Sequence, residues 1–265
     1  TSIDQWGNTG FVNMENAFFG CDKLTTVNDI DGTWCSDVTN MSNMFSGCSS
    51  LTTIDVSNWD VSNVINMYGM FGNCSSLTTL DVSNWDVSNV SNMTYMFYEC
   101  SSLTTLDVSN WDVSSVTNFN HFVFNCNSLT ALDVSSWDVS SVTNFMYFVY
   151  NCNSLTALDV SSWDVSSVTD FDSAFATCDS LTALDVSKWN VSNVTNMYNM
   201  FNNTPLDTTS YDALLIGWSQ LPSLQSNVRL DANLAKYSAG AATTAREILT
   251  SAPNNWKIYD GGQVV

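Results

Sequence analysis

Hydrophobic residues recur with a fixed period of 26 positions along most of this chain, which predicts a stack of structural repeats. Six units run from Ser49 to Thr204, and the second reads SSLTTLDVSNWDVSNVSNMTYMFYEC. Columns of cysteine and tryptophan mark the period, at Cys48, Cys74, Cys100, Cys126, Cys152 and Cys178 and at Trp59, Trp85, Trp111, Trp137, Trp163 and Trp189. Residues 22–48 form a degenerate 27-residue copy, and residues 3–21 match the back part of another.

Within each unit the spacing of apolar residues changes, and this change predicts the local structure. The first half predicts a short strand, which in the first unit lies around Ile54–Val56. The second half places apolar residues on one face of a short helix, at Val64, Met67, Phe71 and Cys74 in the first unit. Ser62 or Asn63 is expected to cap this helix. The stacked units then form an α/β repeat solenoid, with a parallel sheet on one side and short helices on the other.

The periodic pattern stops at Pro205, so we expect three parts: residues 1–48 as degenerate N-terminal repeats or a cap, 49–204 as six repeats, and 205–265 as a C-terminal α/β cap. The solenoid is therefore expected to be covered at both ends. The last part predicts two helices and two strands, over Tyr211–Trp218, Asn227–Leu230, Ala239–Thr250 and Trp256–Tyr259.

Composition narrows the range of partners. The chain has 265 residues, 26 acidic against 6 basic side chains and a net charge of −20, with no Lys or Arg between Lys23 and Lys188. Such a surface repels phosphate backbones and anionic lipids, so we expect no nucleic-acid partner. No stretch approaches the ~18–20 apolar residues of a membrane span, so no membrane insertion is expected. The start at Thr1, without a leader, is typical of a mature product or an excised fragment.

The repeat motif resembles that of a known family. The sequence LDVSNWDVSNVSNM at Leu80–Met93, followed by Met96, Phe97 and Cys100, is similar to the 26-residue repeats of the BspA-like leucine-rich-repeat family of bacterial surface proteins. The segments LLIGW at 214–218, KYSAGAATTAR at 236–246 and NNWKIYDGG at 254–262 resemble the usual close of such proteins. The resemblance implies a secreted or cell-surface bacterial protein that takes part in adhesion, and it carries no catalytic residues.

Aspartates form two columns across the repeats. The candidates are Asp55, Asp60, Asp81, Asp86, Asp107, Asp112, Asp133, Asp138, Asp159 and Asp164, with Asp185 extending the first column. Adjacent strands lie ~4.8 Å apart, so each column stacks like charges that need relief. Two explanations remain open: hydrogen bonds to N–H groups in the following turn, or bound calcium. We therefore expect no cofactor and no metal, and these aspartates are the weak candidates under the calcium alternative.

The cysteines favour buried free thiols over disulfides, since neighbouring helices would lie ~8–10 Å apart, beyond the reach of a disulfide. Cys35 stands outside the column and could pair with Cys21 in the N-terminal region.

Three successive units differ from the others on their outer side. They place aromatic or imidazole rings three residues apart, as Tyr95 with Tyr98, His121 with Phe124, and Tyr147 with Tyr150. These six rings could form an exposed ligand-binding patch, or they could wedge between neighbouring units and extend the core. Flanking units carry small residues at the same positions.

A catalytic role finds little support. His121 is the only histidine, and the pair Asp55 and Asp60 recurs in five units, whereas one active site should break the repeat. We therefore predict a non-catalytic binding or adhesion module for a protein, matrix or polysaccharide ligand. The alternatives are a structural spacer or stalk of a larger surface protein and a calcium-dependent carbohydrate-binding module. The oligomeric state stays open.

Overall fold

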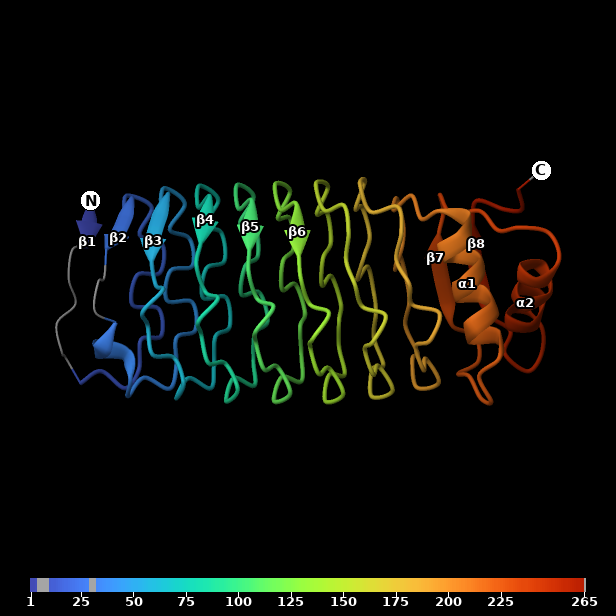
Figure 1. The fold of residues 1–265 in the computed structure, drawn as a ribbon, viewed down its shortest axis with the longest axis horizontal. Helices are drawn as coiled ribbons and strands as arrows, with labels where there is room; N and C mark the ends of the chain where they lie inside the picture. The colour runs from blue at the N-terminus through green and yellow to red at the C-terminus, as the bar shows by residue number, and fades with distance from the viewer. Residues whose placement is uncertain (4–9, 29–31, 265) are drawn as a thin grey trace.

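The repeats stack along one axis into an elongated solenoid, as the sequence predicts (Figure 1). The computed structural model describes residues 1–3, 10–28 and 32–264. Successive coils lie side by side along the long axis of the molecule, and the two long helices cover the end that carries the C-terminus. The strands of the solenoid are β1 (Ser2–Ile3), β2 (Thr26–Asn28), β3 (Thr53–Asp55), β4 (Thr79–Leu80), β5 (Thr105–Leu106) and β6 (Ala131–Leu132). A 3-10 helix, η1 (Thr33–Cys35), lies between β2 and β3.

One wall of the solenoid is made by these short parallel strands. They form two three-stranded sheets, β1-β2-β3 and β4-β5-β6. Equivalent residues pair at the repeat interval, so Leu80 lies opposite Leu106, and Leu106 opposite Leu132. Side chains alternate between core and solvent: Leu80 is buried, whereas Thr79 and Asp81 are exposed. The strand side therefore agrees with the prediction in the first four units, whereas Leu158 and Leu184 of the last two units are buried in the same way but lie outside any strand.

The opposite wall differs from the prediction, because the short helices do not form. In the first unit the N–H groups alternate between two kinds of partner. The Met70 N–H donates to the Met67 carbonyl within the coil (3.2 Å), whereas the Phe71 N–H donates to the Met96 carbonyl of the next coil (2.9 Å). A helix would direct every N–H to its own turn. This wall is instead a stack of tight turns, held together by a ladder of hydrogen bonds between coils.

Left-handed backbone at two positions per unit explains why a helix is excluded. In the first unit these positions are Gly69 (φ 58°) and Asn73 (φ 60°). L-residues do not form helices through left-handed positions, and Gly and Asn adopt them at the smallest cost. Ser62 and Asn63 consequently cap no helix: the Ser62 N–H and hydroxyl donate to Asp60, and the Asn63 side chain donates to the Ser36 carbonyl. The predicted inward residues Val64, Met67, Phe71 and Cys74 are nevertheless all buried.

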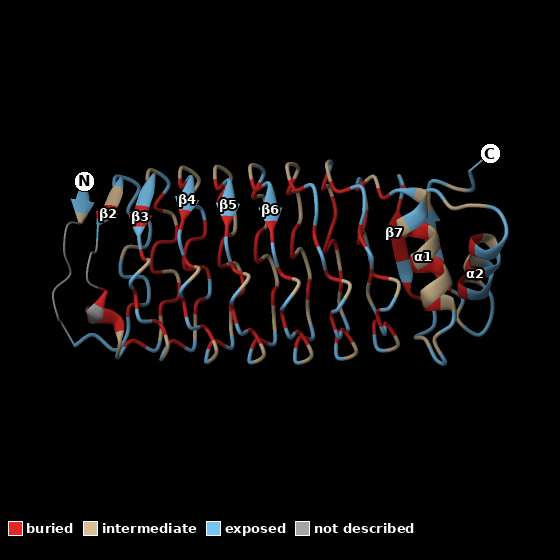
Figure 2. Ribbon diagram, viewed as in Figure 1, coloured by how far each residue is buried: buried red, intermediate tan, exposed pale blue. Residues whose placement is uncertain are grey.

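The space between the two walls is filled by side-chain columns that run the length of the solenoid. Figure 2 shows buried and exposed stretches alternating along every coil. The Trp85 Nε1–H donates to the Val56 carbonyl of the preceding coil (3.0 Å), and the Cys100 thiol to the Phe71 carbonyl (3.1 Å). Burial raises the pKa of the Cys100 thiol to about 12, so it stays protonated. The predicted column of buried thiols is confirmed. The predicted pairing of Cys21 with Cys35 does not occur, because Cys21 is a free, exposed thiol.

The C-terminal elements lie close to their predicted positions. They are α1 (Thr208–Ser219), β7 (Arg229–Ala232), α2 (Ala241–Thr250) and β8 (Lys257–Asp260), with β7 and β8 paired in parallel. The Trp218 Nε1–H of α1 donates to the Val186 carbonyl (2.9 Å), which extends the tryptophan column into this helix. Gly217 permits this contact, because a Cβ there would lie 2.0 Å from the Ser187 carbonyl oxygen. Neither helix of the described chain is long and apolar enough to span a membrane.

Candidate functional site

The aspartate columns lie on the exposed surface and cap turns. The Asp81 Oδ1 accepts hydrogen bonds from the Ser83 N–H (3.2 Å) and hydroxyl (2.7 Å), and Asp86 accepts the same pair from Ser88 (3.1 and 2.6 Å). In every unit the carboxylate accepts the N–H of the serine two residues later, at Asp55, Asp60, Asp81, Asp86, Asp107, Asp112, Asp133, Asp138, Asp159, Asp164 and Asp185. The turn-capping explanation of these columns is confirmed.

These hydrogen bonds stabilise the charged form of the carboxylates. The serine hydroxyl, followed by the serine N–H, lowers the pKa of Asp86, Asp138, Asp159 and Asp185. The serine hydrogen bonds therefore offset part of the repulsion between neighbouring carboxylates in a column. Among the described residues, no three His, Cys, Asp or Glu side chains are grouped so that they could hold a metal ion. Calcium binding at these columns remains a prediction.

A shallow acidic groove follows the first aspartate column. Its volume is about 480 Å³, and its lining includes Asp55, Asp81, Asp107, Thr79 and Thr105. Two similar grooves, of about 390 and 380 Å³, follow the second column beside Trp85 and Trp111. The same groups recur from coil to coil, so no single carboxylate pair is distinguished from its neighbours.

The six rings predicted as a patch come together on the turn wall, and we refer to them as the aromatic block. They form two columns across three coils, made of Tyr95, His121 and Tyr147 and of Tyr98, Phe124 and Tyr150. Neighbouring ring centroids lie 4.4 and 4.6 Å apart in the first column and 4.9 and 4.8 Å apart in the second. All six side chains are half-buried. The rings thus pack against each other between coils and still reach the surface.

The first column of the block stands on left-handed backbone. The φ angles of Tyr95, His121 and Tyr147 are 60°, 57° and 56°. The equivalent residues elsewhere in the stack are Asn43, Gly69, Ser173 and Asn199. Bulky side chains are uncommon in this conformation, which costs on the order of 1–3 kcal/mol per residue. Three successive coils therefore hold rings where other coils hold mostly small or amide-bearing residues.

His121 lies at the centre of the block and is neutral at physiological pH. Its ring stacks on Tyr95 and is tilted by 32° against Tyr147, and its Nδ1 contacts the Asn120 Oδ1. Burial disfavours the charged imidazolium and lowers the pKa of His121 to about 4. The protonated form needed for acid catalysis is therefore scarce near neutral pH.

Two carboxylates that the sequence analysis did not single out flank the block. Glu99 follows Tyr98 and begins a side-chain ladder: Asn125 donates to Glu99 (3.4 Å), and Asn151 donates to Asn125 (2.8 Å). Asp172 lies in the coil beyond Tyr147, whose N–H donates to the Asp172 carbonyl (2.9 Å). Both acidic residues are half-buried. The available signal was that Glu99 stands where the next two units carry asparagine.

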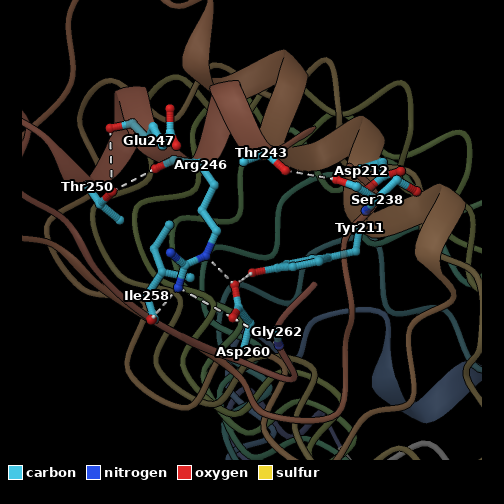
Figure 3. Close-up of polar contacts among 10 residues, drawn as sticks. All are labelled: Tyr211, Asp212, Ser238, Thr243, Arg246, Glu247, Thr250, Ile258, Asp260 and Gly262. Carbon is cyan, nitrogen blue, oxygen red and sulfur yellow. Dashed lines mark hydrogen bonds and ion pairs between the residues drawn. The ribbon is translucent and has the colours of Figure 1, made fainter. Parts of the chain in front are cut away.

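A second cluster of polar groups lies in the C-terminal part (Figure 3). The Asp260 carboxylate accepts hydrogen bonds from the Arg246 Nε–H (2.7 Å) and the Tyr211 hydroxyl (3.0 Å), and Arg246 also donates to the Ile258 carbonyl (3.1 Å). Burial and the Asp260 charge raise the pKa of Tyr211. Because these groups satisfy one another and join α1, α2 and β8, we interpret the cluster as structural.

Comparison with solved structures finds other leucine-rich-repeat proteins. One is a leucine-rich-repeat protein of T. pallidum, with 19% sequence identity and a TM-score of 0.34, where the match covers 68% of this chain and 65% of that one. The match thus spans just under two thirds of the treponemal protein. Another is a leucine-rich cell surface protein of Faecalibacterium prausnitzii A2-165, with 17% identity, a TM-score of 0.36 and coverage of 99% and 79%. A search of the curated proteins finds no match.

A family model confirms the resemblance to bacterial repeat proteins that the 26-residue period indicates. The model matches twice, over residues 12–132 and 117–220, and the two matches together span most of the chain. They include all six units and the degenerate copy before them. The chain belongs to the family described as "Mycoplasma protein of unknown function, DUF285".

Proposed function

We propose that this chain is a non-catalytic binding module of a bacterial surface protein and that its ligand contacts the aromatic block. One observation carries the proposal: three successive coils keep Tyr95, His121 and Tyr147 in left-handed backbone. Stacking alone does not require these rings, because other coils of the same solenoid use Asn, Gly or Ser there. Backbone strain of this kind persists where a function retains it.

The chemistry of the remaining groups agrees with a non-catalytic role. The single histidine is held neutral between two tyrosine rings. The aspartates that could form a carboxylate pair are engaged in the same turn hydrogen bonds in every unit. The aspartates are thus the same in every coil and mark none of them as an active site. The aromatic block, by contrast, sets three coils apart from the others.

Surface display and adhesion form part of this proposal. The sequence resembles the repeats of bacterial surface proteins. Its net charge of −20 favours solubility and disfavours binding to nucleic acids. The ligand would be a protein, a matrix component or a polysaccharide, and repeated contacts along the block would supply the affinity.

A structural spacer is the second candidate, and a specific observation favours it. Each aspartate, thiol and indole column repeats the same hydrogen bond from coil to coil, as in Trp85 to Val56 and Trp111 to Val82. Columns of this kind need no ligand to explain them. A spacer would require only length and stiffness from the stack.

The test is an array of purified matrix proteins and polysaccharides, probed with the wild-type chain and with Tyr98→Ala/Tyr150→Ala. Alanine occupies this position naturally at Ala176, so the fold should persist. We expect wild-type binding that the double variant loses. The matched control is Ile65→Ala/Ile248→Ala, which removes two exposed apolar side chains outside the block.

Each outcome of the array decides between the candidates. Binding that survives in the ring variant would place the ligand elsewhere and overturn the proposal. A wild-type chain that binds nothing would favour the spacer. Each sample is run with calcium and again with a chelator, and calcium-dependent polysaccharide binding would support the carbohydrate-binding alternative at the aspartate columns.

A further inference from the structure

The rings of the aromatic block present mainly their edges to solvent. Neighbouring rings within each column lie 4.4–4.9 Å apart, stacked in three pairs and tilted by 32° between His121 and Tyr147, so the central His121 and Phe124 have a ring on each side. A sugar ring would need an open aromatic face on which to stack, because the π-electron density lies on the faces. The interior rings of the columns therefore offer no open face to a sugar ring.

Two ring faces have no further ring stacked on them, one at each end of the second column. Tyr98 stacks on Phe124 with one face, and no ring of the described chain covers the other, where the preceding coil has Gly72. Tyr150 stacks on Phe124 from the opposite side, and the next coil has Ala176 in place of a further ring. The block thus ends in a tyrosine face at both sides.

An acidic residue adjoins each end of the block. Glu99 follows Tyr98 directly, and burial together with the Glu99 carboxylate raises the pKa of the Tyr98 hydroxyl. Asp172 belongs to the next coil, where its main-chain carbonyl accepts the Tyr147 N–H (2.9 Å) and its Oδ1 accepts the Ser173 hydroxyl (2.7 Å). With adjacent coils ~4.8 Å apart, the two carboxylates are separated by about 14 Å along the axis. The sequence supplies no Lys or Arg between residues 24 and 187 to neutralise them.

The C-terminal part of this chain shows how the same types of group hold a guanidinium. Arg229 lies between the rings of Tyr198 and Tyr259, with its Cζ 4.4 and 4.6 Å from the two centroids. The Asp231 carboxylate accepts two of its N–H groups, at 2.9 Å from Nε and 2.8 Å from Nη2. Tyrosine faces and a carboxylate together match arginine better than lysine, because the planar guanidinium stacks on rings and donates in a fork.

We infer that the aromatic block binds a basic protein through arginine side chains that stack on the end faces of Tyr98 and Tyr150 and pair with Glu99 and Asp172. This inference rests on the proposed function and names its partner class. The strong negative potential of the solenoid increases the rate of encounter with such a partner. The phenol hydroxyls and the amide ladder of Asn125 and Asn151 supply polar contacts between the two ends, as tyrosine and asparagine do in antibody binding sites.

The experiment measures binding of a short peptide of alternating arginine and glycine to the intact chain by fluorescence anisotropy, at low and at raised salt. The test variant is Glu99→Asn/Asp172→Asn, which introduces residues that other units carry at these positions, as in Asn125 and Asn120. The control is Asp81→Asn/Asp107→Asn, which removes the same two charges from the sheet wall. Thermal melting checks that both variants fold.

We expect the wild-type chain to bind the arginine peptide and the Glu99→Asn/Asp172→Asn variant to bind it at least about tenfold more weakly, because the guanidinium loses its charged hydrogen-bond acceptors. The control should change the affinity by less than about threefold, because distant charges are screened. A lysine–glycine peptide of equal length should bind more weakly than the arginine peptide.

Other results would overturn the inference. These are equal losses in the test and control variants, equal binding of spermine or the lysine peptide, which would show that only charge is recognised, and no binding of the arginine peptide. If the array described above shows ring-dependent binding but the arginine peptide neither binds nor competes, the proposed function stands and this inference fails. If the Tyr98→Ala/Tyr150→Ala variant binds as well as the wild-type chain in every assay, both the proposed function and this inference fail.

Discussion

Two parts of the same coils follow different rules: the columns present in every unit, and the aromatic block present in only three. In the columns each residue meets the same partner one coil away, as the Trp111 indole meets the Val82 carbonyl and the Cys126 thiol meets the Phe97 carbonyl. In the block, bulky rings occupy a backbone conformation that other coils give to Asn, Gly or Ser. Repetition is thus explained by stacking, whereas a local exception calls for another cause.

The ends of the columns support this distinction. Where the last unit lacks a cysteine, the Thr204 hydroxyl donates to the Phe175 carbonyl in its place (2.5 Å). Where the repeat itself has ended, Trp218 from α1 makes the indole hydrogen bond. The chain therefore preserves a structural hydrogen bond even when the residue type or the local fold changes. The second column of the aromatic block shows no such continuation, since Gly72 precedes it and Ala176 follows it.

The largest effect is expected from breaking a column. Trp137→Ala should reduce the free energy of unfolding by about 3–5 kcal/mol, because it empties a large buried site and leaves the Val108 carbonyl without its indole donor. Phe124→Ala in the half-buried block should cost about 1–2 kcal/mol. Urea unfolding followed by circular dichroism measures both. Equal losses would show that the block belongs to the core as fully as the columns do.

The sequence predicts the part of the fold that depends on periodicity. The period of 26 locates the solenoid, its parallel strands and its inward residues, and the pattern after Pro205 locates α1 and α2. The spacing of Val64, Met67, Phe71 and Cys74 led to helices that do not form. Burial spacing reports which side chains face inward, but it does not report the sign of φ. Glycine and asparagine at positions such as Gly69 and Asn73 carried that information.

The candidate site was predictable only in its position. Tyr95 with Tyr98 and the two following pairs share a surface, as their spacing indicates. The stacking between coils depends on ring orientation, which no one-dimensional pattern contains. The left-handed backbone under Tyr95 and Tyr147 runs against the preference of tyrosine. Glu99 was missed although it follows Tyr98 directly, because the ladder that it begins with Asn125 and Asn151 forms only between coils. Asp172 was missed because it meets Tyr147 only through the stacking of coils.

A smaller effect is expected from a matched pair within the block. Tyr95 and Tyr98 each contact three other rings, but only Tyr95 stands on left-handed backbone. Tyr95→Asn should therefore cost about 1 kcal/mol less unfolding free energy than Tyr98→Asn, because asparagine relieves the backbone strain at the first position only. Urea unfolding of the two variants gives the difference. A larger loss for Tyr95→Asn would mean that the left-handed position imposes no strain, and it would weaken the argument for the block as a binding site.

The last comparison is a pH dependence that only the block should show above pH 5. Burial lowers the pKa of His121 to about 4 from an ordinary 6.5, so on acidification the unfolded chain binds a proton before the folded chain does. The free energy of unfolding should therefore fall as pH decreases from about 6.5 towards 4, and this contribution should level off below that.

The aspartates act at lower pH: their serine hydrogen bonds lower the pKa of groups such as Asp86 and Asp159, so the stability that they contribute is lost as pH falls through and below 3.8. His121→Phe keeps an aromatic ring and should abolish the slope between pH 6.5 and 5 while retaining the loss at lower pH. Melting temperatures of both proteins across this range give the comparison, and an unchanged slope in the variant would show that His121 is as well solvated in the folded block as in the unfolded chain.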